Sequence, residues 1–230
     1  MNIKFKLLKK FPDGNEQEVD WGNLAQPYPA KKGIPDWLTQ QPAEYDDGGK
    51  TIKKCQPFLD GLTTGYIIPF PDNMTLRLKG KYDFEISGPG GRFISAHGYM
   101  QYNNSWFKDR LVIKFNNPWI IETPHNYSSY IFHPNGKNVK PFYTIPAIVD
   151  TDCYNLSIAL PFVCYENKIG KEIEITKGTP MAQIIPFKRE KWQISIEEAD
   201  HKQWENSQKE LWNDPNNFYL KHIKQKKEYN

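Results

Sequence analysis

The chain has 230 residues, a length that fits one large β domain or two smaller ones and is ample for a hydrophobic core. Hydrophobic residues make up 38% of it, including 13 Tyr, 13 Phe and 7 Trp, a composition that excludes a disordered chain. The 30 basic and 27 acidic residues leave a formal net charge of +3, which is too small for the broad positive field of a dedicated nucleic-acid binder. Nucleic acid is therefore not an expected partner.

Residues 1–50 are expected to wrap around the surface of a domain rather than to build its core. The alternation in IKFKLL, at residues 3–8, predicts an edge strand, and most of the segment after it is rich in proline, glycine and polar residues. Pro35 stands where the first turn of a helix would begin, just before Trp37 and Leu38. A short helix there and a loop are equal alternatives.

Residues 51–196 form the predicted β domain. From Ile67 to Ile196, short apolar or alternating runs separated by turn signals recur about every 8–12 residues, which is typical of a barrel or sandwich. Prolines inside or beside these runs would remove ladder hydrogen bonds, so many strands should be edges or end abruptly. The last run, WQISIEE at residues 192–198, also has the alternation of a strand.

Residues 197–230 are predicted to form a C-terminal helical tail. Trp204, Leu211 and Trp212 fall on one face of a helix that Asp214 and Pro215 would break. The stretch after it combines apolar residues with four lysines. Two interpretations stay open: a docked helix followed by a solvated basic tail, which is the simpler, or a tail that contacts nucleic acid or a membrane.

The three cysteines, Cys55, Cys153 and Cys164, are odd in number and lack a CxxC spacing, which argues against a disulfide framework and a zinc ribbon. Cys55 is expected to be buried and inert. A reducing, cytoplasmic location is the simplest expectation. No apolar run approaches the roughly 20 residues that cross a bilayer, and charges interrupt the first residues where a signal peptide needs its apolar core. We therefore expect no membrane partner and no export.

Two motifs are more specific than these patterns. Residues 148–152 read IVDTD, an apolar strand that ends at an acidic turn, and about 25 residues later residues 178–185 read GTPMAQII. In this order and separation, the segment Thr144–Phe187 resembles the dUTPase and dCTP deaminase (β-clip) superfamily, with weaker matches upstream as far as Gly61. The chain is also similar to uncharacterised phage and environmental proteins that contain the phrases GYIIP, VDTD and GTPMAQ.

The resemblance implies a fold and a set of site residues. The fold is mainly β, a β-clip or related distorted β-barrel or sandwich, followed here by a C-terminal helix. By resemblance, Asp150 is the catalytic carboxylate that orients or deprotonates a water for attack on a nucleotide pyrophosphate. Gln183 is a phosphate-binding or strand-bridging amide. The implied ligand-binding set is completed by His133, Asn135, Lys137 and Asp152.

The resemblance also implies partners. Mg²⁺, if the chain is an enzyme, would be carried mostly by substrate phosphates, because this ion keeps several waters and takes few protein ligands. No dedicated metal site is expected, since the five histidines lack the spacing of one. Proteins of this superfamily are commonly trimers, so a homo-oligomer, with a trimer favoured, is expected, and a nucleotide is the implied ligand.

The chain departs from the family pattern at the residues that do the chemistry. The acidic residue of the first motif falls on Ile67, and the phosphate-binding Arg-Ser-Gly becomes Pro134, Asn135 and Gly136, which removes a guanidinium. The last glycine is Gly178, so the glycine-rich C-terminal arm has no counterpart.

These departures favour a phage-type accessory or structural protein that keeps the scaffold without the full catalytic machinery. The alternative is a nucleotide-binding protein or deoxynucleoside triphosphate pyrophosphohydrolase in which Asp150 orients water. A phage-encoded protein would act in the host cytoplasm.

Three further features have two interpretations each. Residues 87–92, SGPGGR, have the composition of a phosphate cradle, although a hairpin turn is simpler. His97 and Gln101 could line a pocket or could pack beside aromatic residues. Asp150 could be an ordinary turn residue at the end of a strand, and Asp152 would raise its pKa if the two carboxylates shared a pocket.

Overall fold

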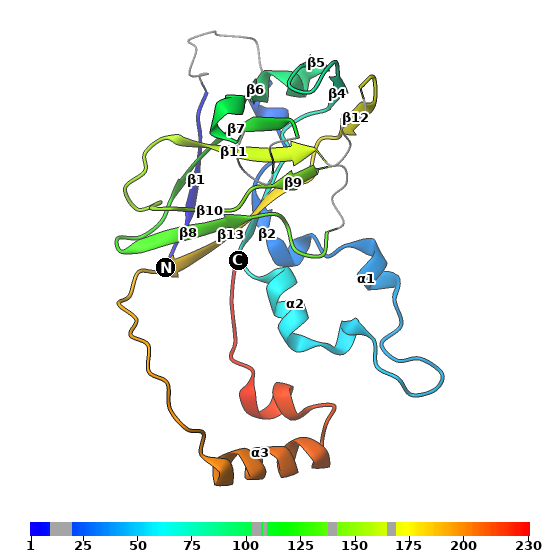
Figure 1. The fold of residues 1–230 in the computed structure, drawn as a ribbon, viewed down its shortest axis with the longest axis vertical. Coiled ribbons are helices and arrows are strands. Elements are labelled where there is room, and N and C mark those ends of the chain that lie inside the picture. Colours follow the sequence, from blue (N-terminus) through cyan, green and yellow to red (C-terminus); the bar gives the residue numbers. More distant parts are fainter. Residues whose placement is uncertain (10–19, 103–106, 108–109, 138–141, 165–168) are drawn as a thin grey trace.

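The structure is a computed structural model that describes residues 1–9, 20–102, 107, 110–137, 142–164 and 169–230. Its strands form three antiparallel sheets (Figure 1). The first sheet has the order β1-β7-β11-β9, with β6 also paired to β7. Its strands are β1 (Lys4–Leu7), β6 (Ile94–Ala96), β7 (Val112–Glu122), β9 (Phe142–Thr144) and β11 (Ser157–Cys164).

The second sheet has the order β10-β8-β13-β3-β2, so that β8 lies between β10 and β13. Its strands are β2 (Tyr28–Pro29), β3 (Tyr66–Pro69), β8 (Tyr127–Phe132), β10 (Ala147–Val149) and β13 (Pro180–Lys188). The third sheet, with the order β12-β4-β5, is built from β4 (Met74–Leu78), β5 (Phe84–Ser87) and β12 (Glu172–Ile175).

One hydrophobic core joins the three sheets. Successive side chains of a strand face opposite sides, so an alternating strand presents one apolar face inward. The fully buried rings include Phe70 and Phe115, whose centroids are 5.2 Å apart, and Phe142 and Phe162, at 5.3 Å. The predicted fold class, mainly β with a C-terminal helix, is confirmed, and of the predicted barrel or sandwich the described strands form three antiparallel sheets without a closed barrel.

The helices lie outside the sheets. They are α1 (Asp36–Gln40), α2 (Gln56–Thr63) and α3 (His201–Asn213). Short 3-10 segments span Trp21–Asn23, Ala30–Lys32, Ile52–Lys54, Pro89–Phe93 and Tyr99–Gln101, and a π-helical turn spans Tyr219–Ile223. The predicted edge strand at residues 3–8 is found as β1 at the edge of the first sheet, and of the two alternatives around Trp37 the helix is found, as α1. No helix among the described residues is both long and apolar enough to cross a membrane.

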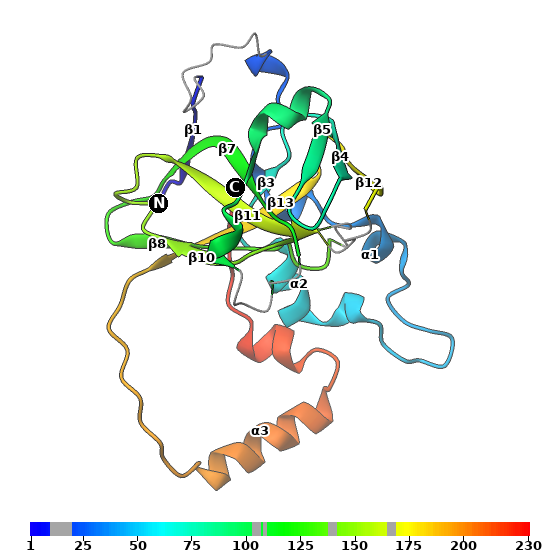
Figure 2. The ribbon, with the colours of Figure 1, turned by 45° about the horizontal axis from the view of Figure 1, so that its top comes forward.

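The C-terminal part differs from the sequence expectation. The helix α3 buries none of its residues, and Trp212 is 78% exposed, so the helix is not docked on the sheets. The chain beyond it returns to the domain instead (Figure 2). The Lys227 ammonium lies 2.7 Å from the Asp60 carboxylate on α2, and the rings of Tyr229 and Tyr66 meet edge to face at 5.8 Å. A salt bridge and an aromatic contact thus hold the predicted solvated tail.

Candidate functional site

Asp150 stands at the end of β10, where the chain makes a tight turn. Its carbonyl accepts hydrogen bonds from the backbone N–H groups of Cys153 and Tyr154, at 3.1 and 3.0 Å. Its carboxylate accepts the Ser128 hydroxyl at 2.6 Å and lies 3.3 Å from the Arg189 guanidinium. The side chain remains 62% exposed. The predicted catalytic residue is therefore a turn residue with polar partners on one side and solvent on the other.

Asp152 has the opposite exposure, with a side chain only 4% exposed. Arg189 donates to both of its carboxylate oxygens, at 2.9 and 2.5 Å, and the backbone N–H of Asn126 donates at 2.8 Å. The Arg189 guanidinium, assisted by the Asn126 N–H, holds the pKa of Asp152 well below its usual range. Arg189 and its partners Ser128, Asp150 and Asp152 are called the Arg189 cluster below.

Thr151, the residue between Asp150 and Asp152, is buried, and both its hydroxyl and its carbonyl make hydrogen bonds. The Thr151 hydroxyl lies 2.7 Å from the Thr123 hydroxyl and 2.9 Å from that of Ser129. The backbone N–H of Thr123 donates to the Thr151 carbonyl at 3.1 Å. These bonds fix the turn against β8 and account for the threonine of the Asp-Thr-Asp sequence on structural grounds.

Gln183 lies at the other end of β8, where it pairs with Phe132. Its side chain is completely buried, and its amide donates to the carbonyls of Gly61 and Thr64 at 3.0 and 2.7 Å. Its carbonyl oxygen accepts the backbone N–H of Asn135 at 3.1 Å. The Gln183 side chain thus connects the end of α2 to the turn after β8.

The turn after β8 is filled by the protein's own chain. The Asn135 amide donates to the Gly61 carbonyl at 3.1 Å, and the Trp37 indole donates to the Gly136 carbonyl at 2.7 Å. The Lys137 ammonium donates to the carbonyl of Gly33, and burial lowers the pKa of Lys137 to about 8. The Asn135 and Lys137 side chains, which would meet a phosphate at this turn, are thus bonded to carbonyls of α2 and of the N-terminal segment.

His133 also faces inward. Its Nδ1 accepts the backbone N–H of Thr144 at 3.2 Å, and its ring packs against Phe142 and Tyr143 at centroid distances of 5.9 and 5.2 Å. Burial lowers the pKa of His133, so the ring is neutral at physiological pH. The imidazole is committed to packing and to a backbone hydrogen bond.

The predicted site residues therefore form two groups. Asp150 and Asp152 come together in the Arg189 cluster, whereas Asn135 and Gln183 come together at the far end of β8. Ser128 and Phe132, which mark these ends, are separated by about 13 Å at the usual rise of a strand. Sequence reasoning missed Arg189 and Ser128, because nothing in the chain signals that the residues after β10 and β13 meet across β8.

Within the Arg189 cluster, Asp152 is not suited to bind a divalent cation directly. Mg²⁺ requires free carboxylate oxygens, and both oxygens of Asp152 are occupied by Arg189. Within the described residues, no group of three or more His, Cys, Asp or Glu side chains could hold a metal ion.

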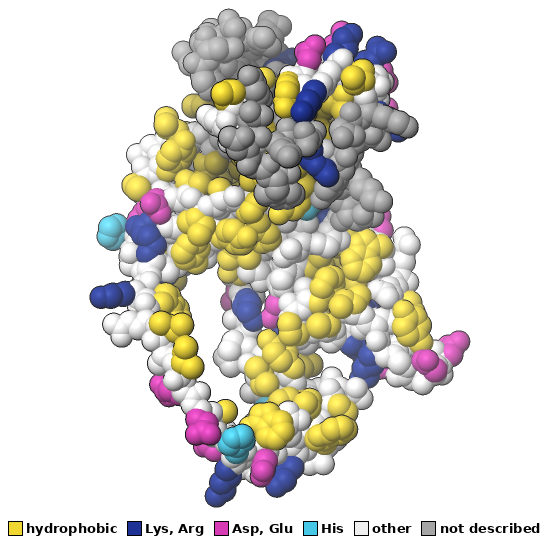
Figure 3. Space-filling view, viewed as in Figure 1, with side chains coloured by type: hydrophobic (Ala, Val, Ile, Leu, Met, Phe, Trp, Pro, Cys, Tyr) yellow, Lys and Arg dark blue, Asp and Glu magenta, His cyan; other side chains and the backbone are white. Residues whose placement is uncertain are grey.

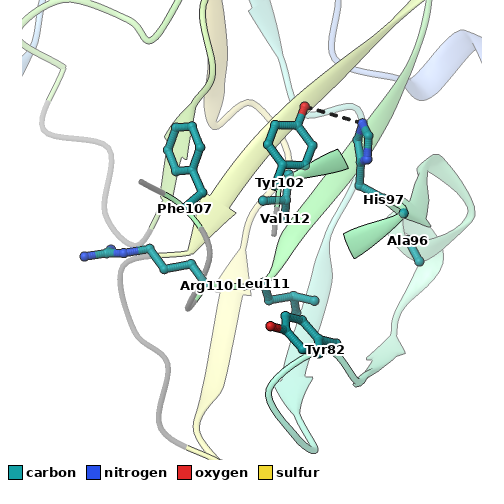
Figure 4. A pocket seen from close by; sticks show the side chains of 9 residues that line it. Tyr82, Ala96, His97, Tyr102, Phe107, Arg110, Leu111 and Val112 are labelled. Carbon is teal, nitrogen blue, oxygen red and sulfur yellow. Dashed lines mark hydrogen bonds between the residues drawn. The ribbon is translucent and has the colours of Figure 1, made fainter. Parts of the chain in front are cut away.

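A separate cavity of about 240 Å³ lies beside β7 (Figure 4). It is lined by Tyr82, Ala96, His97, Gly98, Tyr102, Phe107, Arg110, Leu111 and Val112. The rings of His97 and Tyr102 meet edge to face at 4.7 Å, and burial lowers the pKa of His97. Both interpretations of His97 thus hold, because it packs beside an aromatic ring and also lines a pocket.

The glycine-rich loop is neither a hairpin nor a phosphate cradle. It connects β5 in the third sheet to β6 in the first and contains a 3-10 turn at Pro89–Phe93. The N–H groups of Gly90 and Gly91 donate to the carbonyls of Asn73 and Gly88, at 2.8 and 3.1 Å. Neither N–H group is left for an anion. The expectation of a buried Cys55 is also wrong, since this thiol is exposed.

No protein-family model matches this chain, and no curated protein matches it. Solved structures to which it is similar include the EIAV dUTPase, at 12% identity and a TM-score of 0.33, covering 60% of this chain and 85% of that one. They also include the dUTPase of S. aureus phage phi11 and that of Staphylococcus bacteriophage 80alpha. For each phage enzyme the identity is 11%, the TM-score 0.34, and the coverage 60% of this chain and 83% of the other. A likeness this remote does not bear on function.

Proposed function

We propose that this chain is a non-catalytic β-scaffold protein that acts by self-association, in the manner of a phage-type accessory or structural protein. The observation that carries the proposal is where the two motif residues, Gln183 and Asp150, lie and what they bond to. Gln183 is buried and bonded to its own chain, and Asp150 lies at the opposite end of β8 beside a guanidinium. A hydrolase needs a carboxylate and phosphate donors that converge on one substrate.

The phosphate donors of the resemblance support the same proposal. Asn135, Lys137 and Gln183 donate to backbone carbonyls of the N-terminal segment or of α2. A nucleotide phosphate at this turn would have to displace these bonds.

We further propose a homotrimer, in the cytoplasm or in the host cytoplasm if the chain is phage-encoded. The large exposed side chains of the second sheet, Tyr130, Ile148 and Phe187, support such a surface.

One observation favours a second candidate, a nucleotide-binding protein or deoxynucleoside triphosphate pyrophosphohydrolase. The Asp150 carboxylate is 62% exposed, and Arg189 beside it supplies a guanidinium that is absent from residues 134–136. In this candidate, Asp150 orients a water and Arg189 meets the phosphate charge. No step passes through a metal bound by the protein.

Pyrophosphate release decides between the candidates. The purified full chain is incubated with a panel of deoxynucleoside triphosphates and Mg²⁺, and release and thermal shift are measured. We expect neither turnover nor a shift. Asp150→Asn tests the second candidate. Its matched control is Asp46→Asn, which makes the same change at an exposed turn far from Asp150 in the sequence. Turnover that Asp150→Asn abolishes and Asp46→Asn preserves would overturn the non-catalytic proposal.

A further inference from the structure

The cavity of about 240 Å³ beside β7 is lined by residues of both the first and the third sheet. Ala96 and Val112 border it at neighbouring ends of β6 and β7, and Tyr82 reaches it from the turn between β4 and β5. Ala96 pairs with Ile113 across the sheet, and the backbone N–H of His97 donates to the Val112 carbonyl at 3.4 Å. The strand backbone therefore fixes one wall of the cavity, which shares no lining residue with the Arg189 cluster.

The walls of the cavity are mainly apolar and aromatic. Leu111 and Val112 are 8% and 5% exposed, and the ring centroids of Tyr102 and Phe107 are 6.1 Å apart in an edge-to-face arrangement. Figure 4 shows these side chains around one space, with Tyr82 below the two rings. Apolar walls favour a ligand with an apolar body, and aromatic side chains favour a flat ring.

Basic side chains border the same space. Arg110 lines the cavity, and Lys114 follows Val112 on the same face of β7, because residues two apart on a strand face the same side. Neither basic side chain forms an ion pair or a side-chain hydrogen bond with another described residue. Burial, and after it the charge of Lys114, lowers the pKa of His97 in the cavity wall. Of the described residues that line the cavity, none is acidic. The charge of the site therefore suits an anionic group.

The volume of the cavity limits the size of its ligand. A cavity of about 150 Å³ holds a benzene molecule, whereas sites for drug-sized ligands span about 300–1,000 Å³. A volume of about 240 Å³ lies between these sizes. It accommodates one aromatic ring with a small substituent and is too small for a nucleotide.

We propose that this cavity binds a small aromatic carboxylate. The ring of the ligand packs against the aromatic side chains of the wall, and its carboxylate meets the guanidinium of Arg110. A guanidinium holds a carboxylate through two parallel N–H···O bonds, and the ammonium of Lys114 adds a second positive charge. The ligand thus supplies the partner that the described part of the chain does not give to Arg110.

The site is separate from the surface of the proposed self-association. Figure 3 shows hydrophobic side chains gathered over the second sheet and around α3. In Figure 1, β6 and β7 lie at the end of the molecule opposite α3, and no residue that lines the cavity belongs to the second sheet or to α3. The proposal therefore goes beyond the proposed function and can fail without it.

Calorimetric titration of the full chain with benzoate tests the site. Saturable binding is expected, with a dissociation constant at or below about 1 mM, which suits a ligand of this size. Benzyl alcohol keeps the ring without the charge, and cyclohexanecarboxylate keeps the charge without the flat ring. Each should bind at least ~10-fold more weakly than benzoate. A titration with benzoate that does not saturate would overturn the site, and equal binding of the three compounds would overturn the ligand class.

Two variants assign the binding to the cavity. Arg110→Met should weaken benzoate at least ~10-fold and leave benzyl alcohol unchanged, because it removes the charge and keeps an apolar chain. Arg77→Met on β4 is its matched control, at an exposed position outside the cavity. Ala96→Trp should abolish binding by filling the space, with Ala199→Trp as its control at another exposed alanine. Thermal unfolding should match wild type, because none of the four substituted side chains is buried.

The backbone amides of the cavity wall locate the ligand independently of any variant. In proton–nitrogen correlation spectra, benzoate should shift the signals of Gly98, Leu111 and Val112 and leave that of Thr151, beside the Arg189 cluster, in place. Shifts confined to other amides, or benzoate binding that survives in both Arg110→Met and Ala96→Trp, would overturn the assignment. Oligomeric state and nucleotide turnover test the proposed function and are read in separate measurements.

Discussion

The guanidinium of Arg189 closes on the carboxylate of Asp152 through two nitrogen–oxygen contacts, of 2.9 and 2.5 Å. The two residues belong to segments that follow different strands, β13 and β10, on either side of β8. The contact therefore ties the segment that follows β13 to the turn that carries Asp150. A carboxylate that is only 4% exposed depends on such a partner to remain charged.

Replacing Arg189 should destabilise the fold. Arg189→Met leaves the carboxylate of Asp152, which is only 4% exposed, without its charged partner, so the Tm is expected to fall by several degrees in thermal unfolding. Lys188→Met is the matched control, because Lys188 is 55% exposed and its ion pair with Glu190 lies on the surface. Equal Tm values for the two variants would contradict a structural role for Arg189.

The Arg189–Asp152 pair should make the stability of the fold depend on pH. The pKa of Asp152 is lowered in the folded state from an ordinary value of 3.8, so the folded state binds its proton less well than the unfolded state. The stabilisation is therefore present above about pH 4 and is lost as the pH falls through the lowered pKa. The difference in Tm between wild type and Arg189→Met should be larger at about pH 7 than at about pH 3. A difference that stays constant over this range contradicts the assignment.

The Thr151 hydroxyl should contribute to stability without contributing to chemistry. Thr151→Val keeps the shape of the side chain but leaves the hydroxyls of Thr123 and Ser129 short of a partner in a buried site. The free energy of unfolding is expected to fall by about 1–3 kcal/mol, measured by urea denaturation. Thr176→Val, at an exposed hydroxyl, should change it by less than about 0.5 kcal/mol.

Local patterns predicted the strands that have one face in the core. A local pattern indicates which side chains face inward, because this information is contained in neighbouring residues. Examples are the alternation of residues 3–8 and the apolar runs that form β3, β8 and β13. Residues 192–196, which alternate like a strand but form none, show the limit of such patterns. The sequence WQISI encodes a two-faced strand, but whether a sheet edge lies beside it depends on the path of the whole chain.

The partners in the candidate site could not be predicted, because they are set by sheet order. Asp152 meets Arg189 only because β10 and β13 both pair with β8. Gln183 finds Gly61 and Thr64 only because β13 also pairs with β3, which directly follows α2. Local motifs single out Asp150 and Gln183 in the sequence, whereas long-range packing decides what each of them touches.

Gln183 should behave as a structural bridge. Gln183→Met keeps the length of the side chain, yet it removes the donor for the Thr64 carbonyl and the acceptor for the Asn135 N–H in a fully buried site. The free energy of unfolding should fall by at least about 2 kcal/mol, as read from denaturant titration. Gln203→Met on exposed α3 is the control and should be neutral. A stable Gln183→Met protein would argue against the bridge.

Gly65, between α2 and β3, should be intolerant of any side chain. Its φ is +82°, and a Cβ there would stand 2.0 Å from the Ile184 carbonyl oxygen on β13. Gly48 has nearly the same φ, +81°, with nothing within 4 Å of the added Cβ, so both Ala variants carry the same backbone strain. Gly48→Ala should cost about 1–2 kcal/mol, the cost of left-handed backbone alone. Gly65→Ala should exceed it by more than about 2 kcal/mol in the same denaturation assay, because a strand backbone must move. Equal losses in the two variants would mean that β3 and β13 are not packed as closely as the Ile184 contact requires.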